Sequence, residues 1–195
     1  MPILNGSSTP NLYLALVHYP VINKHGDVIA SAVTNLDVHD IARAAATYGV
    51  RGFYLVTPLV DQIALIRRLI SHWTNGAGAT YNPQRRRALE LVRIKENLDD
   101  VMAEIRGNIG SKALPRTVVT SARNQRPVIG FETLRRMIGE GHPYLLVFGT
   151  AWGLTETLIS AADFALAPVK GPTTYNHLSV RSAVTVVLDR LLGRE

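Results

Sequence analysis

The C-terminal stretch, residues 144–192, constrains the fold of this chain more than any other part. It begins with an apolar run at residues 144–148, which has the length of a strand and suits a sheet that is covered on both faces. A turn containing Gly149 and Gly153 follows, since glycine lets the backbone turn tightly. The order then predicted is a short helix, a second buried strand around Leu166, a Pro/Gly loop and a terminal helix.

Strand-length apolar runs alternate with helical periodicity along the rest of the chain as well. The pattern predicts strands at residues 12–18, 52–58 and 117–121, and helices at residues 37–48, 59–73, 83–106 and 131–138. Asp37 is expected to cap the first of these helices, and Pro83 suits the first turn of the third. This alternation predicts an α/β fold, with a mostly parallel sheet of five to six strands and helices on both faces. Periodicity alone suggests the open strand order of a flavodoxin-like sheet.

Composition and charge narrow the class of protein. With 195 residues, 47% of them apolar and 18% charged, the chain is expected to form a single folded domain over residues 1–195. A formal net charge of +6 favours a polyanionic partner such as RNA. Without cysteine there is no thiolate metal site, and the six histidines form no His-x-x-x-His pair, so no metal is expected. No apolar segment has the length of a membrane span and the N-terminus lacks the pattern of a secretory signal, so we expect a cytoplasmic protein.

Two motifs near the C-terminus carry a resemblance to a known superfamily. The first is Phe-Gly-Thr-Ala-Trp-Gly-Leu at residues 148–154, and the second is His-Leu-Ser-Val-Arg-Ser-Ala at residues 177–183. In this order they resemble the cofactor half of the SPOUT superfamily of RNA methyltransferases. The whole chain is similar to one small bacterial family within it, described as similar to tRNA guanine-N1 methyltransferases. The resemblance implies a C-terminal trefoil knot, a homodimer and S-adenosylmethionine as the cofactor.

The resemblance also implies which residues bind this cofactor. Backbone groups of loops that follow successive strands would hold it. The expected positions are Thr120, Phe148, Gly149, Thr150, Gly153, Leu166, Pro168, Val169, Leu178 and Ser179. Other interpretations stay open, since the glycines can belong to an ordinary strand-to-helix turn. Thr120 can equally close a strand end, and Ser179 can be a helix N-cap.

Arg43 is the candidate catalytic residue. In the ribose-methylating branch of the superfamily, an arginine stands six residues before the glycine that ends a first motif, and Arg43 stands six before Gly49. The match is incomplete, because Asn35 is displaced by one position and His39 replaces an expected glycine. Arg43 could orient the substrate or its phosphate with its planar set of donors. The alternative is an exposed helical arginine paired with Asp40 or Asp37.

Three consecutive arginines, Arg85, Arg86 and Arg87, form the candidate RNA-binding surface. They open the helix predicted after a glycine-containing loop and give a dense positive charge, which suits phosphate groups. The alternative is a solvated helix start, although positive charge opposes the dipole at that end of a helix.

These observations support three functions. The first is methyl transfer from S-adenosylmethionine to a nucleotide of tRNA or rRNA, which needs no metal. The second is a knotted RNA-binding or regulatory protein with little catalysis. The third is a flavodoxin-like nucleotide-binding module whose motifs match the superfamily by accident.

Overall fold

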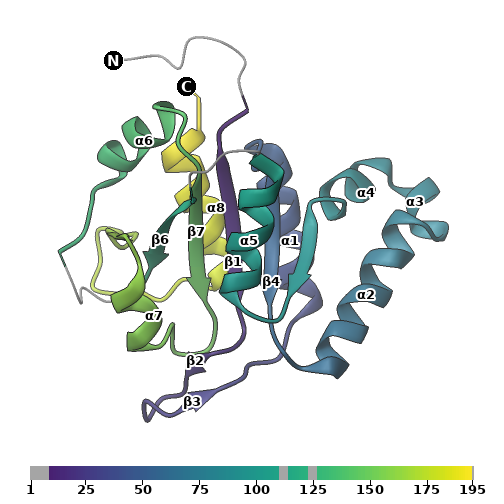
Figure 1. Ribbon diagram of the computed structural model, residues 1–195, viewed down its shortest axis with the longest axis horizontal. Coiled ribbons are helices and arrows are strands. Elements are labelled where there is room, and N and C mark those ends of the chain that lie inside the picture. The colour runs from purple at the N-terminus through teal and green to yellow at the C-terminus, as the bar shows by residue number, and fades with distance from the viewer. Residues whose placement is uncertain (1–8, 110–113, 123–126, 195) are drawn as a thin grey trace.

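The main sheet is parallel throughout, as Figure 1 shows for the computed structural model, which describes residues 9–109, 114–122 and 127–194. Its strand order is β5-β4-β1-β7-β6-β8. The strands are β1 (Leu12–Val17), β4 (Gly52–Val56), β5 (Val92–Lys95), β6 (Arg116–Thr120), β7 (Tyr144–Gly149) and β8 (Phe164–Leu166). A small antiparallel hairpin, β2 (Val21–Ile22) with β3 (Val28–Ile29), lies outside the sheet. The predicted α/β fold with a mostly parallel sheet is therefore confirmed.

Helices cover both faces of the sheet (Figure 1). They are α1 (Asn35–Thr47), α2 (Val60–Thr74), α3 (Ala77–Tyr81), α4 (Pro83–Leu89), α5 (Leu98–Ile109), α6 (Phe131–Gly139), α7 (Glu156–Ala161) and α8 (Val180–Leu192). Successive residues of a strand point to opposite faces, so each apolar strand supplies two cores. Leu12, Leu14 and Leu16 of β1 pack in one core with α1, α6 and α8, whereas Tyr13, Ala15 and Val17 pack in the other with α5 and α7. No helix in the described part of the chain is long and apolar enough to cross a membrane.

The structure corrects the long helix that the sequence predicts over residues 83–106. The helix ends at Leu89, the chain forms the edge strand β5, and a new helix begins at Leu98. Leu91, Ile94 and Leu98 have helical spacing, which concealed the strand. The short apolar alternation around Val92 and Ile94 also fits a strand, and parallel pairing with β4 provides its hydrogen bonds. Phe53 N–H, for example, donates to the Leu91 carbonyl at 3.0 Å.

Strand order differs from the flavodoxin-like order that periodicity suggests. The third strand of the sheet along the chain, β5, lies outside β4, and β1 pairs with β7 on its other side. Local periodicity carries no information about which strands become neighbours, because neighbours are selected by packing between distant segments.

Strand β8 has backbone hydrogen bonds on both of its sides. On one side, β8 pairs with β6, with Thr120 opposite Leu166. On the other side, Ile129 N–H donates to the Ala165 carbonyl and the Ile129 carbonyl accepts from Ala167 N–H, both at 2.9 Å. Thr120 and Ile129, which are nine positions apart in the sequence, thus lie on opposite sides of β8.

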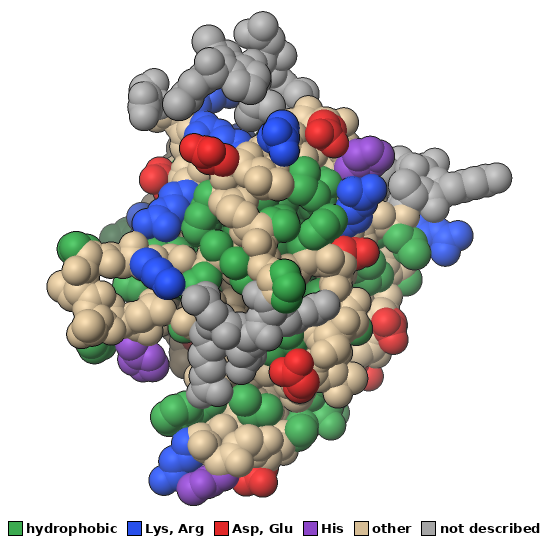
Figure 2. Space-filling model, turned by 90° about the vertical axis from the view of Figure 1, so that its left-hand side faces the viewer, with side chains coloured by type: hydrophobic (Ala, Val, Ile, Leu, Met, Phe, Trp, Pro, Cys, Tyr) green, Lys and Arg blue, Asp and Glu red, His purple; other side chains and the backbone are tan. Residues whose placement is uncertain are grey.

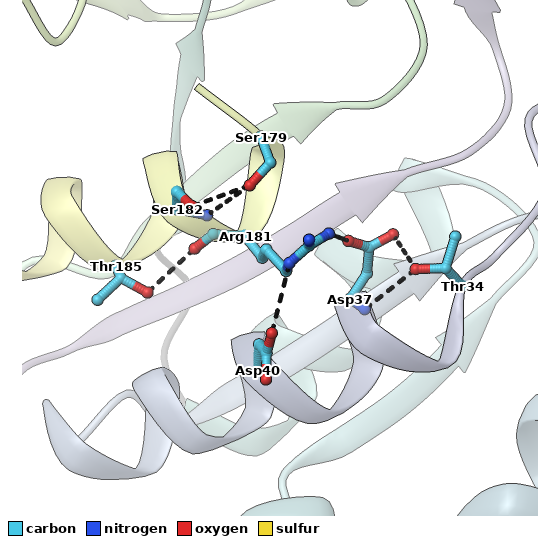
Figure 3. Close-up of polar contacts among 7 residues, drawn as sticks. All are labelled: Thr34, Asp37, Asp40, Ser179, Arg181, Ser182 and Thr185. Carbon is cyan, nitrogen blue, oxygen red and sulfur yellow. Dashed lines mark hydrogen bonds and ion pairs between the residues drawn. The ribbon is translucent and has the colours of Figure 1, made fainter. Parts of the chain in front are cut away.

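Helix α8 is fixed to α1 by polar contacts between the first turn of α8 and the first two turns of α1 (Figure 3). Arg181 lies between two carboxylates of α1, with its Nη1 3.6 Å from Asp37 Oδ1 and its Nε 3.4 Å from Asp40 Oδ2. Asp37 is buried and also accepts the Thr34 hydroxyl at 2.6 Å. Thr34, and not Asp37 as predicted, is the N-cap of α1, since its hydroxyl oxygen accepts from Asp37 N–H.

The contact between Arg181 and Asp37 gives a stability prediction. Arg181→Gln leaves the Asp37 carboxylate buried without its cation, and we expect a loss of about 1–2 kcal/mol in the free energy of unfolding, since Arg181 itself is partly exposed. In an Asp37→Asn background the same change is expected to cost less. Urea unfolding of the four proteins measures the coupling. Arg43→Gln, at an exposed position of α1, is the matched control and is expected to change stability by less than about 0.5 kcal/mol. A coupling near zero would contradict the prediction.

Candidate functional site

Three loops converge at the carboxyl edge of the sheet, where strands β6, β7 and β8 end. Ligands of parallel sheets bind beyond this edge. The pairing of β6 with β7 and with β8 places Thr120, Gly149 and Leu166 at neighbouring strand ends. The sequence-predicted cofactor positions are thus brought together from segments far apart in the chain.

The turn after β7 is tight, and its glycines are required by its own backbone. A Cβ on Gly149 would lie 2.7 Å from the Leu154 nitrogen, so the turn folds back against that position. Gly153 has φ +115°, a backbone conformation that residues with a side chain rarely adopt. Its N–H donates to the Thr150 carbonyl at 3.0 Å. Ala151 also has a positive φ of 52°. The glycine pattern is therefore explained by the shape of the turn, whichever ligand the turn holds.

The β2–β3 hairpin holds this turn by backbone hydrogen bonds. Ile22 N–H donates to the Gly153 carbonyl at 3.0 Å, and Trp152 N–H donates to the Ile22 carbonyl at 3.1 Å. Val21 forms a bridge with Leu154. Trp152 itself stays 56% exposed, so the hairpin fixes the backbone and leaves a large aromatic side chain at the surface.

A buried polar chain links the turn to β1. His18 has no exposed surface, and its Nδ1 lies 3.1 Å from Ser31 Oγ, which in turn contacts Thr150 Oγ1. The Thr150 hydroxyl donates to the Val17 carbonyl at 2.9 Å, so it accepts from Ser31, and Ser31 accepts from a protonated Nδ1. His18 Nε2 is buried and has no hydrogen-bond partner within the described residues. Sequence reasoning missed this network because it examined histidines only for metal-ligand spacing.

Burial lowers the pKa of His18 to about 4, against the opposing influence of the Asp37 carboxylate and of the Ala32 and Ser31 carbonyls. The ring is therefore neutral at physiological pH. A neutral imidazole in this position can orient Ser31 and Thr150 but carries no charge toward a ligand.

The side chains of several predicted residues are buried or hydrogen-bonded within the protein. Phe148 and Leu166 are core residues, each 3% exposed. The Thr120 hydroxyl donates to the Val147 carbonyl at 3.1 Å, so it closes the strand end as the alternative interpretation has it. Thr150 is occupied by the network with His18.

The loop after β8 leads to the second motif. Pro168 and Val169 are half-buried, whereas residues 170–179 are exposed. Asn176 Nδ2 donates to the Ala122 carbonyl at 2.9 Å, which brings this loop to the end of β6. Ser179 is the N-cap of α8 and accepts from Ser182 N–H, and Leu178 stays 47% exposed beside it.

Arg43 lies on another surface, in a groove of about 550 Å³ between α1 and α8. It is exposed, and its predicted carboxylate partners, Asp37 and Asp40, contact Arg181 instead. Arg181 and Ser182 line the same groove, so Arg43 is near the start of α8. Its catalytic role stays a prediction.

The three arginines of α4 differ in their surroundings. The Arg85 guanidinium stacks over the Trp73 ring at 4.3 Å, and Arg86 pairs with Glu90 at 2.9 Å. Arg87 is exposed. They lie at the β5 edge of the sheet, whereas the three converging loops lie at the β8 edge (Figure 1).

Figure 2 looks onto the opposite side of the molecule, the side with α6 and α7, where apolar side chains gather among charged ones. In the described ranges, no three His, Asp or Glu residues are grouped as metal ligands.

His18 predicts a pH dependence of stability. Its pKa is about 4 in the folded chain and about 6.5 when unfolded, so between these values only the unfolded chain binds the proton. Stability is therefore full above pH 6.5 and falls toward pH 4, by up to about 3 kcal/mol from this residue. His18→Asn should flatten the profile over this range in urea unfolding, relative to the parent. His25→Asn, at an exposed turn position, should not, and a His18→Asn profile parallel to that of the parent would contradict the assignment.

Comparison with known proteins supports the superfamily resemblance. A family model described as SAM-dependent RNA methyltransferase matches residues 11–193. A tRNA (guanine-N(1)-)-methyltransferase of Oleidesulfovibrio alaskensis is 45% identical over 183 residues, which cover 94% of this chain but 42% of that protein. An uncharacterized protein of Aquifex aeolicus is 38% identical over 185 residues, covering 94% of this chain and 89% of that protein. The chain thus spans less than half the length of the relatives that are named as tRNA methyltransferases.

Solved structures share the fold at low sequence identity. A putative methylase family protein from Neisseria gonorrhoeae has a TM-score of 0.65 at 18% identity, covering 95% of this chain and 83% of that one. The TrmH/SpoU tRNA modifying enzyme of A. aeolicus has a TM-score of 0.54 at 17% identity, covering 94% and 74%. These neighbours confirm the SPOUT methyltransferase fold, and the flavodoxin-like alternative is set aside. Together with the family model, they show that the chain belongs to the SAM-dependent RNA methyltransferase family.

Proposed function

We propose that this chain binds S-adenosylmethionine at the carboxyl edge of β6, β7 and β8 and methylates a nucleotide of RNA, with tRNA as the first candidate. The convergence of the three predicted loops at that edge carries the proposal. The name of the O. alaskensis relative favours tRNA, but most of that protein lies outside the matched region, so its guanine-N1 specificity is not transferred to this chain.

Two features of the site fit the cofactor. Residues 170–179 are exposed, so backbone donors and acceptors of this loop are open to the methionine part and the ribose. Leu178 is apolar and yet 47% exposed at the end of the same loop, as contact with an adenine ring requires. Pro168, Val169 and the 149–153 turn would complete the pocket from the other two sides.

Bound S-adenosylmethionine supplies an electrophilic methyl group on its sulfonium. The chain then has to align the RNA nucleophile with that methyl and provide for loss of the nucleophile's proton. Backbone groups of a turn that is fixed by the hairpin and by Thr150 suit alignment, because they need little reorganisation. Arg43 is exposed and not paired with Asp37 or Asp40, so it is the proposed contact for an RNA phosphate near the second motif.

We also propose that the chain is knotted and dimeric. The enclosure of β8 between Thr120 and Ile129 supports passage of the C-terminal segment through the loop between β6 and α6. A crystal structure that traces this loop tests the knot.

The open α1–α8 groove supports a homodimer through these helices, and light scattering of the purified chain tests it. A cytoplasmic location follows from the RNA substrate, and fractionation of cells tests it. The assignment of residues 1–195 to one domain stays a prediction.

The cofactor site gives a binding prediction. Gly149→Ala puts a methyl group 2.7 Å from the Leu154 nitrogen and must displace the turn, so affinity for S-adenosylmethionine should fall at least about tenfold in titration calorimetry. Gly107→Ala, where a methyl group meets nothing within 4 Å, is the matched control. If Gly149→Ala does not fold, Leu178→Asp at an exposed position serves instead. Unchanged affinity in a folded variant at either position would refute the site.

Methyl transfer is tested with labelled S-adenosylmethionine on separated tRNA and rRNA that lack the modification. We expect the labelled methyl group to appear in RNA, and one molecule of S-adenosylhomocysteine to form for each methyl group transferred. Arg43→Ala should lower the rate about tenfold or more with unchanged cofactor affinity, since one phosphate contact is lost. Arg106→Ala, an exposed arginine on the opposite face of the sheet, is the charge-matched control. Cofactor binding without transfer to either RNA would favour the regulatory protein over the enzyme.

A further inference from the structure

The helices between β4 and β5 form a lobe, residues 60–90, that concentrates positive charge. It contains five arginines against two carboxylates, Asp61 and Glu90, a surplus of three charges. This is half of the formal net charge of +6, carried by 31 of 195 residues. Arg67 and Arg68 on α2 and Arg86 and Arg87 on α4 are all exposed. Such a concentration fits a polyanion better than a neutral protein surface.

The lobe is built around an aromatic centre. The Trp73 ring contacts the Arg85 guanidinium on its face at 4.3 Å and the rings of His39 and His72 edge-on at 5.6 and 5.1 Å. Gly78 packs so closely that a Cβ there would lie 2.6 Å from the Trp73 ring. Arg85 therefore packs within the lobe. Of the three arginines predicted to contact RNA, Arg86 and Arg87 are the exposed ones.

Tyr81 stands out from this packed lobe. It is 86% exposed, more than any other exposed large apolar side chain of the described residues. Its backbone is nevertheless ordered, because Tyr81 is the last residue of α3 and the next residue, Asn82, is held by two hydrogen bonds. Asn82 N–H donates to the Gly78 carbonyl at 3.0 Å, and Asn82 Oδ1 accepts from Arg85 N–H at 2.9 Å as the N-cap of α4. An almost fully exposed aromatic ring on an ordered backbone, shortly before the three arginines of α4 in the chain, has the composition of a nucleobase-stacking surface.

We propose that the lobe docks unpaired nucleotides of the RNA substrate, with Tyr81 stacking on a base and Arg86 and Arg87 contacting phosphates. This inference rests on the proposed function for the identity of the RNA as substrate. Paired RNA would offer phosphates to the arginines but no free base face to Tyr81, so the exposed ring favours a loop or single strand. Strand β5, beside the lobe, lies three to five strand spacings, roughly 14–24 Å, from the strands β7, β6 and β8 that the cofactor loops follow. Docking is therefore separate from methyl transfer.

The test measures RNA affinity without cofactor, by fluorescence anisotropy with a labelled oligouridine of about twelve nucleotides and a duplex of similar length. Tyr81→Ala should weaken oligouridine binding about tenfold and leave duplex binding unchanged, because a base then loses the ring on which it stacks. Tyr81→Phe keeps the ring and should bind like the parent. Arg86→Ala with Arg87→Ala should lower the slope of log affinity against log salt by about 0.7 for each lost phosphate contact, whereas Arg106→Ala should not.

Each outcome decides the inference. Unchanged oligouridine affinity in Tyr81→Ala overturns it and leaves the lobe as a surface for a protein partner. Equal losses for oligouridine and duplex overturn the preference for unpaired nucleotides. Cofactor affinity of the Tyr81 variants, measured in parallel, separates the two proposals. If the parent chain binds the cofactor but no RNA, docking is refuted. If it binds RNA through Tyr81 but does not bind the cofactor, the proposed enzyme alone is refuted.

Discussion

Parallel pairing of β1 with β7 is the constraint on which the rest of the structure depends. It joins residues more than a hundred positions apart, with Leu12 opposite Tyr144 and Val17 opposite Gly149. This register brings the end of β1, with His18, beside the turn after β7. Both strands are buried on both faces, so a slip by one residue would exchange the two cores and separate His18 from Thr150. The position of the turn is therefore set by the packing of the sheet.

Much of this architecture could be predicted from the sequence. The buried strands at residues 12–18, 52–58 and 144–148 are long apolar runs. Pro83 lies in the first turn of α4, as expected, and Ser179 is the N-cap of α8. The errors came where local patterns were ambiguous. The apolar residues around β5 fit a helix and a strand equally well, and only the open edge of β4 decides between them. Thr34 and Asp37 are both good caps, and the helix begins two residues earlier than the apolar pattern indicates.

The candidate site could be predicted in outline but not in its contacts. The glycines marked the turn, yet they are required by the backbone of the turn itself and so say little about a ligand. His18 and Ser31 had no local signal, because their contact with Thr150 arises only from the pairing of distant strands. Arg85 looked like a surface cation, but it packs on Trp73, whose side chain comes from a different helix. Polar contacts of this kind depend on tertiary structure, which residue spacing alone does not provide.

The match to the family and the geometry of the site establish different properties of the protein. The fold, the family and its dependence on S-adenosylmethionine rest on a match to nearly the whole chain. The name tRNA (guanine-N(1)-)-methyltransferase, which specifies an RNA and a methylated atom, belongs to relatives that are more than twice as long as this chain. The chain itself contributes a preorganised turn, an exposed loop with Leu178 at its end, and a positively charged lobe at the other edge of the sheet.

The most direct test of the central claim is a crystal structure of this chain with S-adenosylhomocysteine. We predict that the ligand lies at the ends of β6, β7 and β8, with backbone contacts from residues 149–153 and from the loop after Leu166. Density for the ligand elsewhere, such as in the α1–α8 groove, would contradict the account, as would a site that stays without density at saturating ligand.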